Sequence, residues 1–282
     1  MERAFLFFTD LDQTISPLDV DGIVRLIAVV KRVETHGVKF KIIPITGRTP
    51  EYALAFLHIL NASFERERLF DVCEVGAGEQ GAAVIYVKKS YDIKVLTSRT
   101  DIKERVAHVL SNFEYAQMLS DEPGKRFTCS IHIKDEWCKT LDAAKKKSIL
   151  SCLNDAVLKE LGPSVVKVSL SHKTLEIAST EVSKNRALEF IMNDYASQFD
   201  IVGMSYSGDA ANDLECVQWV QKFSHTAAVS KKIKVHVFLP SNAIACLECE
   251  QESGDVIQRA KRPLLEGVLD LVESALDSGE LF

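Results

Sequence analysis

The chain has 282 residues, of which 46% are hydrophobic and 26% charged, and its formal net charge is −6 at pH 7. This length suits one large domain or two modest ones, and the composition is ordinary for a globular protein. The acidic balance argues against nucleic acid or an anionic membrane surface as a partner, because both require a basic face.

The sequence has no feature of a membrane or secreted protein. No apolar run approaches the roughly 20 residues that a membrane span requires, and Met1 leads into the first apolar run without the pattern of a secretory signal. The seven cysteines are an odd, scattered set, which favours reduced thiols. Cys246 and Cys249 form a C-x-x-C without the second pair that a zinc site needs, so we expect inert thiols in a cytoplasmic protein.

The apolar run at residues 5–8 predicts a buried strand that ends where Asp10, Asp12 and Thr14 begin. Two carboxylates at the end of a buried strand are costly without a partner cation. The pattern therefore indicates a metal site or a catalytic nucleophile. The alternative is a turn with a helix cap, since Asp and Thr favour both.

The following segments alternate between helical and strand-like spacing. They are a helix at 20–35, a strand at 39–45, a helix at 51–60, and short strands at 71–75 and 82–87. This order is typical of a parallel sheet with right-handed crossovers.

The middle of the chain has a different pattern. Its expected elements are a strand at 94–97, a helix at 102–119, a strand at 126–133, a helix at 141–161, and strands at 165–170 and 174–178. The one-sided alternation of these strands predicts an open sheet with helices on one face, which is an α+β module inserted into the first domain.

After Ser183 the α/β pattern resumes. The expected elements are a helix at 186–195, a strand at 201–205, a helix at 214–220, strand-like runs at 226–229 and 235–239, and a helix at 263–276. We therefore predict an α/β fold. Residues 1–84 and 180–282 would form a Rossmann-like core with a parallel sheet, and residues 85–179 the inserted domain.

Four polar loops each follow a predicted strand of the first domain. They are Asp10-x-Asp12-x-Thr14, Thr46-Gly47-Arg48, Ser183-Lys184 and Gly208-Asp-x-x-Asn-Asp213. The C-terminal ends of parallel strands line the crevice where ligands bind, so these loops should converge. Several carboxylates beside one lysine describe a hard cation facing a phosphate, and Mg²⁺ shares its ligands with phosphate oxygens in this way.

Each loop alone has a purely structural explanation. Thr46-Gly47 could be a strand-to-helix turn, Lys184 a solvated charge, and residues 208–213 a cap for the next helix. Their occurrence in order along one sheet edge favours a shared site.

As a set, these motifs resemble the haloacid dehalogenase-like phosphohydrolase superfamily. The four matching motifs are D-x-D-x-T at Asp10, the threonine of T-G-R at Thr46, the lysine at Lys184, and G-D-x-x-N-D at residues 208–213. The long insert before Lys184, and Ser241-Asn-Ala243 after a strand, resemble the branch with a C2-type α+β cap. That branch includes sucrose-phosphate, trehalose-phosphate and Cof-like phosphatases, and phosphomannomutases.

The sequence departs from the family pattern at two places. Gln13 stands where relatives usually carry glycine, and Glu79-Gln-Gly81 lies in a region where relatives often carry Asn-Gly. Gln13 carries no catalytic role in the resemblance, and the alignment at the second place is loose.

The resemblance implies a role for each acidic residue. Asp10 would be the nucleophile that forms an aspartyl-phosphate, and Asp12 the general acid and base. Mg²⁺ would bind the Asp10 carboxylate, the Asp12 backbone carbonyl and Asp209, with Asp213 as direct or outer support.

The resemblance also implies the phosphate contacts. Thr46, Gly47 and Lys184 would hold the phosphoryl oxygens, and Asn212 would orient Lys184 or Asp10. Arg48, beside the phosphate loop, is a candidate for contacting the substrate. The polar candidates in the cap are Lys125, Arg126, His132, Lys134, His172 and Lys173, and exposed surface charge is the competing interpretation for each of them.

These features predict a Mg²⁺-dependent phosphatase that acts on a small phosphorylated metabolite, a sugar phosphate. Two alternatives stay open: a phosphomutase of the same branch, and a catalytically silent binding protein on this scaffold. The oligomeric state is open between monomer and dimer.

Overall fold

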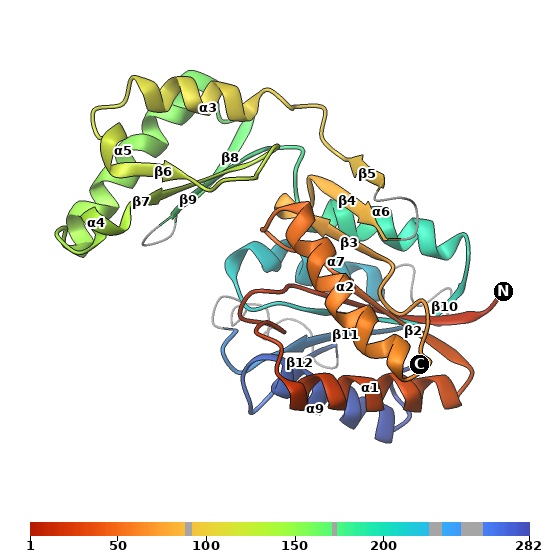
Figure 1. Cartoon of the computed structure of the whole chain (residues 1–282). Helices are drawn as coiled ribbons and strands as arrows, with labels where there is room; N and C mark the ends of the chain where they lie inside the picture. Colours follow the sequence, from red (N-terminus) through yellow and green to blue (C-terminus); the bar gives the residue numbers. More distant parts are fainter. Residues whose placement is uncertain (88–91, 171–173, 226–232, 244–255) are drawn as a thin grey trace. The chain divides into compact units, whose positions relative to one another are not determined.

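The computed structural model describes residues 1–87, 92–170, 174–225, 233–243 and 256–282 (Figure 1). The chain divides into two compact units, residues 1–94 with 184–282 and residues 95–183. We call them the core unit and the inserted unit. The limits differ from the predicted 85–179 because the segment before residue 95 belongs to the core unit. The strand-like run at 226–229 and the Cys246–Cys249 pair lie outside the described residues.

A five-stranded parallel sheet forms the centre of the core unit, in the order β12-β11-β10-β1-β2. Its strands are β1 (Arg3–Thr9), β2 (Val38–Pro44), β10 (Asp200–Ser207), β11 (Lys234–Leu239) and β12 (Ile257–Arg259). Thr9 lies opposite both Pro44 and Ser207, so β1, β2 and β10 end at the same level. The register therefore brings three loops to one sheet edge.

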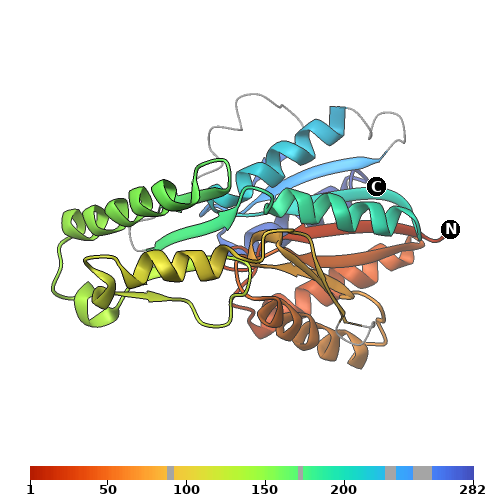
Figure 2. The ribbon, with the colours of Figure 1, turned by 90° about the horizontal axis from the view of Figure 1, so that it is seen from above.

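Helices cover both faces of this sheet (Figures 1 and 2). They are α1 (Val20–Thr35), α2 (Pro50–Arg66), α6 (Lys184–Ala196), α7 (Leu214–His225) and α9 (Leu264–Asp277). Helices α1, α2 and α9 share one apolar core with Phe5, Phe7 and Phe40 of the sheet. The Asp19 side chain caps α1 by accepting from the Gly22 N–H, and Thr49 caps α2 in the same way, directly before Pro50.

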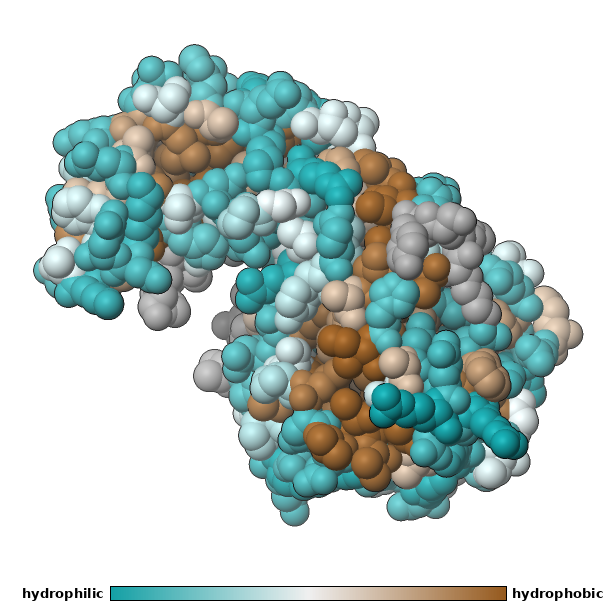
Figure 3. Space-filling model, viewed as in Figure 1, coloured by the Kyte–Doolittle hydropathy of each residue, from teal (hydrophilic) through white to brown (hydrophobic). Residues whose placement is uncertain are grey.

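Apolar side chains also gather on the surface over α1 and α2 (Figure 3). Val20 and Val24 of α1 are 75% and 58% exposed, and Ile59 of α2 is 56% exposed. Apolar atoms contribute a large share of the surface of any folded protein. Among the described helices, none is long and apolar enough to cross a membrane.

The strand predicted at 71–75 is wrong. The strand here is β3 (Val75–Gly78), which pairs antiparallel with β4 (Ala83–Tyr86) and lies in a separate sheet with β5 (Asp92–Val95). Gly76 and Gly78 lie inside β3, which packs closely on α2. A Cβ on Gly78 would lie 2.5 Å from the Pro50 nitrogen.

The inserted unit contains a four-stranded antiparallel sheet in the order β6-β7-β9-β8. Its elements are α3 (Ile102–Ser111), β6 (Leu119–Asp121), β7 (Cys129–Ile133), α4 (Asp135–Cys138), α5 (Ala143–Leu161), β8 (Val166–Leu170) and β9 (Thr174–Ser179). Ile131 and Ile177 pack with residues of α3 and α5 in one apolar core. Ser130 and His132 alternate with Ile131 and so belong to the opposite sheet face.

The helix predicted at 102–119 is too long. Helix α3 ends at Ser111, and Leu119 begins strand β6. Asn112 stops the helix, because its side-chain amide donates to the His108 carbonyl at 3.0 Å and its own N–H bonds the last turn. The α/β fold with its parallel central sheet is confirmed.

Candidate active site

Three of the four predicted loops meet at the C-terminal edge of the parallel sheet. The loops follow β1, β2 and β10, and the Asp10 N–H donates to the Ser207 carbonyl at 2.7 Å. Lys184 reaches the site differently from the prediction. It is the first residue of α6 and follows β9, a strand of the inserted unit rather than of the first domain.

Lys184 lies between two buried carboxylates. Its Nζ donates to Asp10 Oδ1 at 2.6 Å and to Asp213 Oδ1 at 2.7 Å. The side chains of Lys184 and Asp213 are 1% and 0% exposed, so water screens the attraction between their charges very little. Burial alone would lower the pKa of Lys184, but Asp10 and Asp213 raise it above its ordinary value. The lysine is therefore a permanent cation.

Asp10 lies close to two other carboxylates, those of Asp213 and Asp209. Burial raises the pKa of Asp10 to about 7, Lys184 opposes this shift, and Asp213 and Asp209 add to it. Within the part of the chain that the structure describes, Lys184 is the group that favours the charged form of this carboxylate. A nucleophilic carboxylate at this position requires additional positive charge.

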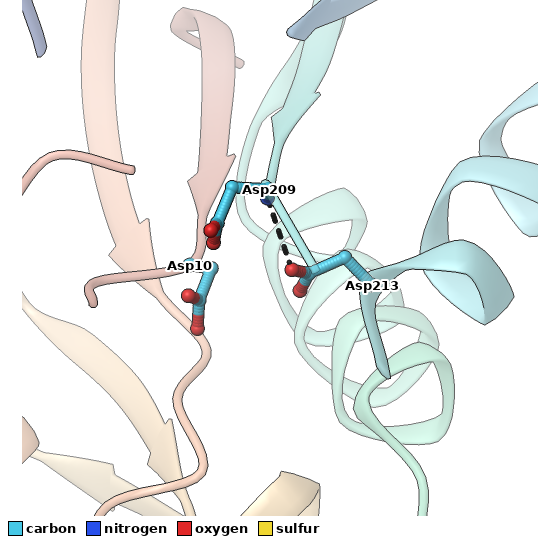
Figure 4. A group of neighbouring side chains, drawn as sticks. All are labelled: Asp10, Asp209 and Asp213. Carbon is cyan, nitrogen blue, oxygen red and sulfur yellow. Dashed lines mark hydrogen bonds between the residues drawn. The ribbon is translucent and has the colours of Figure 1, made fainter. Parts of the chain in front are cut away.

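Asp213 accepts hydrogen bonds from four donors. Oδ1 accepts from Lys184 and from the Tyr206 hydroxyl at 2.6 Å. Oδ2 accepts from the N–H groups of Ala210 at 3.0 Å and of Asp209 at 3.1 Å, and Figure 4 draws the Asp209 bond. A carboxylate offers about four lone-pair positions. All of them are used, so Asp213 suits an organising role better than direct metal ligation. Glycine is required at 208, because a Cβ there would lie 2.5 Å from Asp213 Cγ.

Asp10 and Asp209 fit a hard cation. Each of Asp10, Asp209 and Asp213 has a carboxylate oxygen within 4.8 Å of those of the other two (Figure 4). Burial, and then Asp213, raise the pKa of Asp209 to about 6. Thr14 Oγ1 donates to Asp209 Oδ1 at 3.2 Å and holds it in place. A divalent cation with oxygen ligands would relieve the repulsion between these carboxylates.

Asp12 and Arg48 form a two-pronged ion pair. Arg48 Nε donates to Asp12 Oδ2 at 2.8 Å, and its Nη2 donates to Oδ1 at 3.3 Å. The Arg48 side chain is 46% exposed and the Asp12 side chain 40%. Asp12, the expected general acid, is thus more accessible than Asp10. Arg48, the expected substrate contact, orients Asp12 in this structure.

Thr46, in the loop that follows β2, is fully buried. Its N–H donates to the Ala77 carbonyl at 2.9 Å, and Thr46 Oγ1 accepts from the Arg48 N–H at 3.1 Å. These bonds fix the turn that presents Gly47.

The Asn212 side chain has another partner than predicted. Its Nδ2 donates to Gln80 Oε1 at 3.2 Å, whereas the sequence led us to expect a bond that orients Lys184 or Asp10. The acceptor comes from the turn between β3 and β4, which the sequence did not place beside this loop.

The substrate candidates of the cap belong to the inserted unit. Arg126 is exposed on the segment before β7. His172 and Lys173 lie outside the described residues.

Three site residues escaped the sequence analysis as functional positions. Tyr206 holds Asp213, Gln80 contacts Asn212, and Asn242 Nδ2 donates to the Gln13 carbonyl at 2.7 Å within the Asp10 loop. Tyr206 could have been noticed because it is a tyrosine inside a buried strand, where its hydroxyl needs a hydrogen-bond partner. No local pattern identifies Gln80.

A parallel sheet with acidic loops after β1 and β10, a threonine loop after β2 and a buried lysine defines a haloacid dehalogenase-like hydrolase. The family model for sucrose-6F-phosphate phosphohydrolase matches residues 3–231. The chain belongs to this family, and it is a phosphatase, a phosphoric monoester hydrolase of the C2-capped branch.

Solved structures share the fold over nearly the whole chain. Sucrose-phosphatase from Synechocystis sp. PCC6803, in complex with sucrose and phosphate, is 14% identical, with 97% of this chain and 98% of that chain covered and a TM-score of 0.56. Trehalose-6-phosphate phosphatase from Aspergillus fumigatus is 16% identical, with 98% of this chain and 93% of that chain covered and a TM-score of 0.53. Protein 0175 from Thermoplasma acidophilum is 14% identical, with 97% of this chain and 98% of that chain covered and a TM-score of 0.60. No curated protein sequence matches this chain.

Proposed function

We propose that this phosphatase hydrolyses a small sugar phosphate with Mg²⁺ as its cofactor. The observation that carries the proposal is the sealed cluster of Asp10, Lys184 and Asp213 beside Asp209. The family match and the likeness to a sucrose-phosphatase and a trehalose-6-phosphate phosphatase support a sugar phosphate as the substrate.

In the first step, an Asp10 oxygen attacks phosphorus and the bond between phosphorus and the sugar oxygen breaks. Asp12 gives its proton to the departing alkoxide. In the second step, Asp12 takes a proton from water, and this water displaces Asp10 from the aspartyl-phosphate. Phosphate leaves, and both carboxyl groups return to their starting states.

The Lys184 ammonium group has one more hydrogen-bond donor than its two carboxylate partners use. An ammonium group carries three donors, and two of them bind Asp10 and Asp213. The third is available for a phosphoryl oxygen, together with the Gly47 N–H. When bound by Asp10 and Asp209, Mg²⁺ would offset the repulsion between an anionic nucleophile and an anionic phosphate.

We further propose that residues 85–179 select the organic part of the substrate. Ser130, His132 and Glu176 belong to the sheet face opposite the apolar core of the inserted unit, where Ser130 Oγ donates to Glu176 at 2.6 Å. Replacing His132 or Glu176 by alanine should change the ranking of sugar phosphates and leave hydrolysis of a small aryl phosphate near the wild-type rate.

The proposal is tested by phosphate release from a panel of phosphorylated metabolites, with and without Mg²⁺. Release from one class of sugar phosphate, dependent on Mg²⁺, is the expected result. Formation of an isomeric sugar phosphate without release would favour a phosphomutase. No turnover of any ester, including an aryl phosphate, would favour a catalytically silent binding protein.

The role of Asp12 has its own test. Alkyl phosphates have poor leaving groups that need a proton, whereas p-nitrophenolate leaves without one. Asp12→Ala should therefore lower the rate on alkyl phosphates by about 10²-fold or more, the range for a general acid, and lower the p-nitrophenyl phosphate rate far less. Equal losses on both substrates would contradict the assignment.

A further inference from the structure

The turn between β3 and β4 packs on the phosphate loop. The Glu79 N–H donates to the Arg48 carbonyl at 2.6 Å, and the Gln80 N–H donates to the Thr46 carbonyl at 3.1 Å. Glu79 and Gln80 both have left-handed backbones, with φ of 49° and 59°. Side chains rarely adopt this conformation, so the surrounding contacts must hold the turn in place.

The Gln80 side chain lies directly over Gly47. Its Nε2 is 2.7 Å from the position that a Cβ on residue 47 would occupy. A side chain at residue 47 would therefore displace the Gln80 amide. The absence of a side chain at Gly47 leaves both the Gly47 N–H and the Gln80 Nε2 beside the same loop.

The orientation of the Gln80 amide is set by Asn212. Gln80 Oε1 accepts from Asn212 Nδ2 at 3.2 Å, so its Nε2 faces the other way. Among the described residues, Gln80 Nε2 has no hydrogen-bond acceptor, although the side chain is half-buried. An oriented donor without an acceptor, next to a phosphate loop, is suited to an anionic ligand.

We propose that Gln80 Nε2 donates a hydrogen bond to a phosphoryl oxygen of the substrate, and that Asn212 positions this amide. The proposal rests on the phosphatase function given above. It assigns Asn212 an indirect role through Gln80. The phosphoryl group would then receive donors from three segments: the phosphate loop, the start of α6, and the β3–β4 turn.

The test uses two Gln80 variants of similar size. Gln80→Glu keeps an oxygen for Asn212 and replaces the Nε2 donor by a carboxylate oxygen that repels phosphate. Gln80→Met removes the donor without adding charge. Gln198→Glu makes the same charge change at an exposed residue just beyond α6 and serves as the control.

Two readouts are needed, the affinity for inorganic phosphate by calorimetry in the presence of Mg²⁺ and kcat/KM for p-nitrophenyl phosphate. We expect Gln80→Met to lose about tenfold in kcat/KM, and Gln80→Glu about 10²-fold, the scale for removing one oxyanion donor. Phosphate affinity should fall in the same order. Gln198→Glu should match the wild type.

The proposal is overturned if Gln80→Glu binds phosphate as the wild type does, or if Gln80→Glu and Gln80→Met lose affinity equally. Equal losses would indicate a packing role, and the thermal midpoints of both variants show whether the turn has been disrupted. Failure of the phosphatase function is distinguishable, because the wild type would then release no phosphate from any ester while the phosphate-binding comparison still tests Gln80.

Discussion

Lys184 of the core unit and Lys125 of the inserted unit are both buried lysines, but their acidic partners differ. The partners of Lys184 are 8% and 0% exposed and bond to it at 2.6 and 2.7 Å. Those of Lys125, Glu122 and Glu176, are 20% and 31% exposed and lie at 3.2 and 3.4 Å. Lys125 also donates to the Ser130 hydroxyl.

This difference separates a sealed charge cluster from one that water can enter. Removing the cation from a sealed cluster leaves buried carboxylates without compensation. Removing it from a half-exposed cluster lets the carboxylates regain hydration. The core cluster therefore depends on each of its charges, whereas the carboxylates around Lys125 in the inserted unit are partly open to water.

The largest contrast is expected between Lys184→Met and Lys125→Met. We expect Lys184→Met to lower the free energy of unfolding by about 3–5 kcal/mol, the cost of breaking a buried pair, and to abolish phosphate release. Lys125→Met should cost about 1 kcal/mol, as for a pair accessible to water, and retain p-nitrophenyl phosphate hydrolysis. Urea denaturation and a phosphate assay measure both effects. Equal costs for the two variants would contradict the comparison.

A smaller effect is expected at Tyr206, whose hydroxyl donates a hydrogen bond to Asp213 of the sealed cluster. Tyr206→Phe removes one donor from buried Asp213 and should cost about 1–2 kcal/mol of stability. Looser placement of Lys184 and the Asp209 loop should lower kcat about tenfold, which corresponds to about 1.4 kcal/mol.

The matched control for Tyr206 is Tyr195→Phe. Tyr195 is also buried, but it lies near the C-terminal end of α6, where it stacks on Phe199. Its variant should retain the wild-type kcat. A Tyr206→Phe enzyme with unchanged kcat and Mg²⁺ requirement would show that Asp213 does not need this donor.

The smallest effect is expected at Gln13. This exposed residue has a left-handed φ of 62°, and Asn242 bonds its carbonyl. Gln13→Gly should raise the free energy of unfolding by about 0.5–1 kcal/mol, since glycine adopts this conformation at little cost. The kcat should not change. A lower thermal midpoint for Gln13→Gly would mean that the glutamine side chain contributes contacts that outweigh its backbone strain.

The sequence was sufficient where local patterns determine the structure. Helix α1 spans the predicted residues because Asp19 caps it and its apolar residues repeat with helical spacing. The parallel orientation of β1, β2 and β10 followed from the alternation of strands and helices, and it is confirmed. Asp10, Asp209 and Lys184 could be grouped in advance, because parallel strands end at one sheet edge and the motif lysine was recognisable.

The sequence was insufficient where contacts between residues far apart in the chain determine the local structure. The glycines at 76 and 78 form a strand because α2 packs against them, which no local pattern reports. Lys125 was a substrate candidate with exposed surface charge as the competing interpretation, and its burial against Ser130 and Glu176 depends on long-range contacts. Gln80 and Asn212 are 132 residues apart, so their contact could not be anticipated.

The central claim is that Asp10 is the nucleophile of a Mg²⁺-dependent phosphatase. The most direct measurement is phosphate release by wild type and Asp10→Asn from p-nitrophenyl phosphate, at saturating Mg²⁺ and with Mg²⁺ removed, with thermal midpoints measured in parallel. The account predicts that Asp10→Asn folds but releases no phosphate, and that the wild type stops when Mg²⁺ is removed. Near-normal turnover by a folded Asp10→Asn enzyme would contradict it.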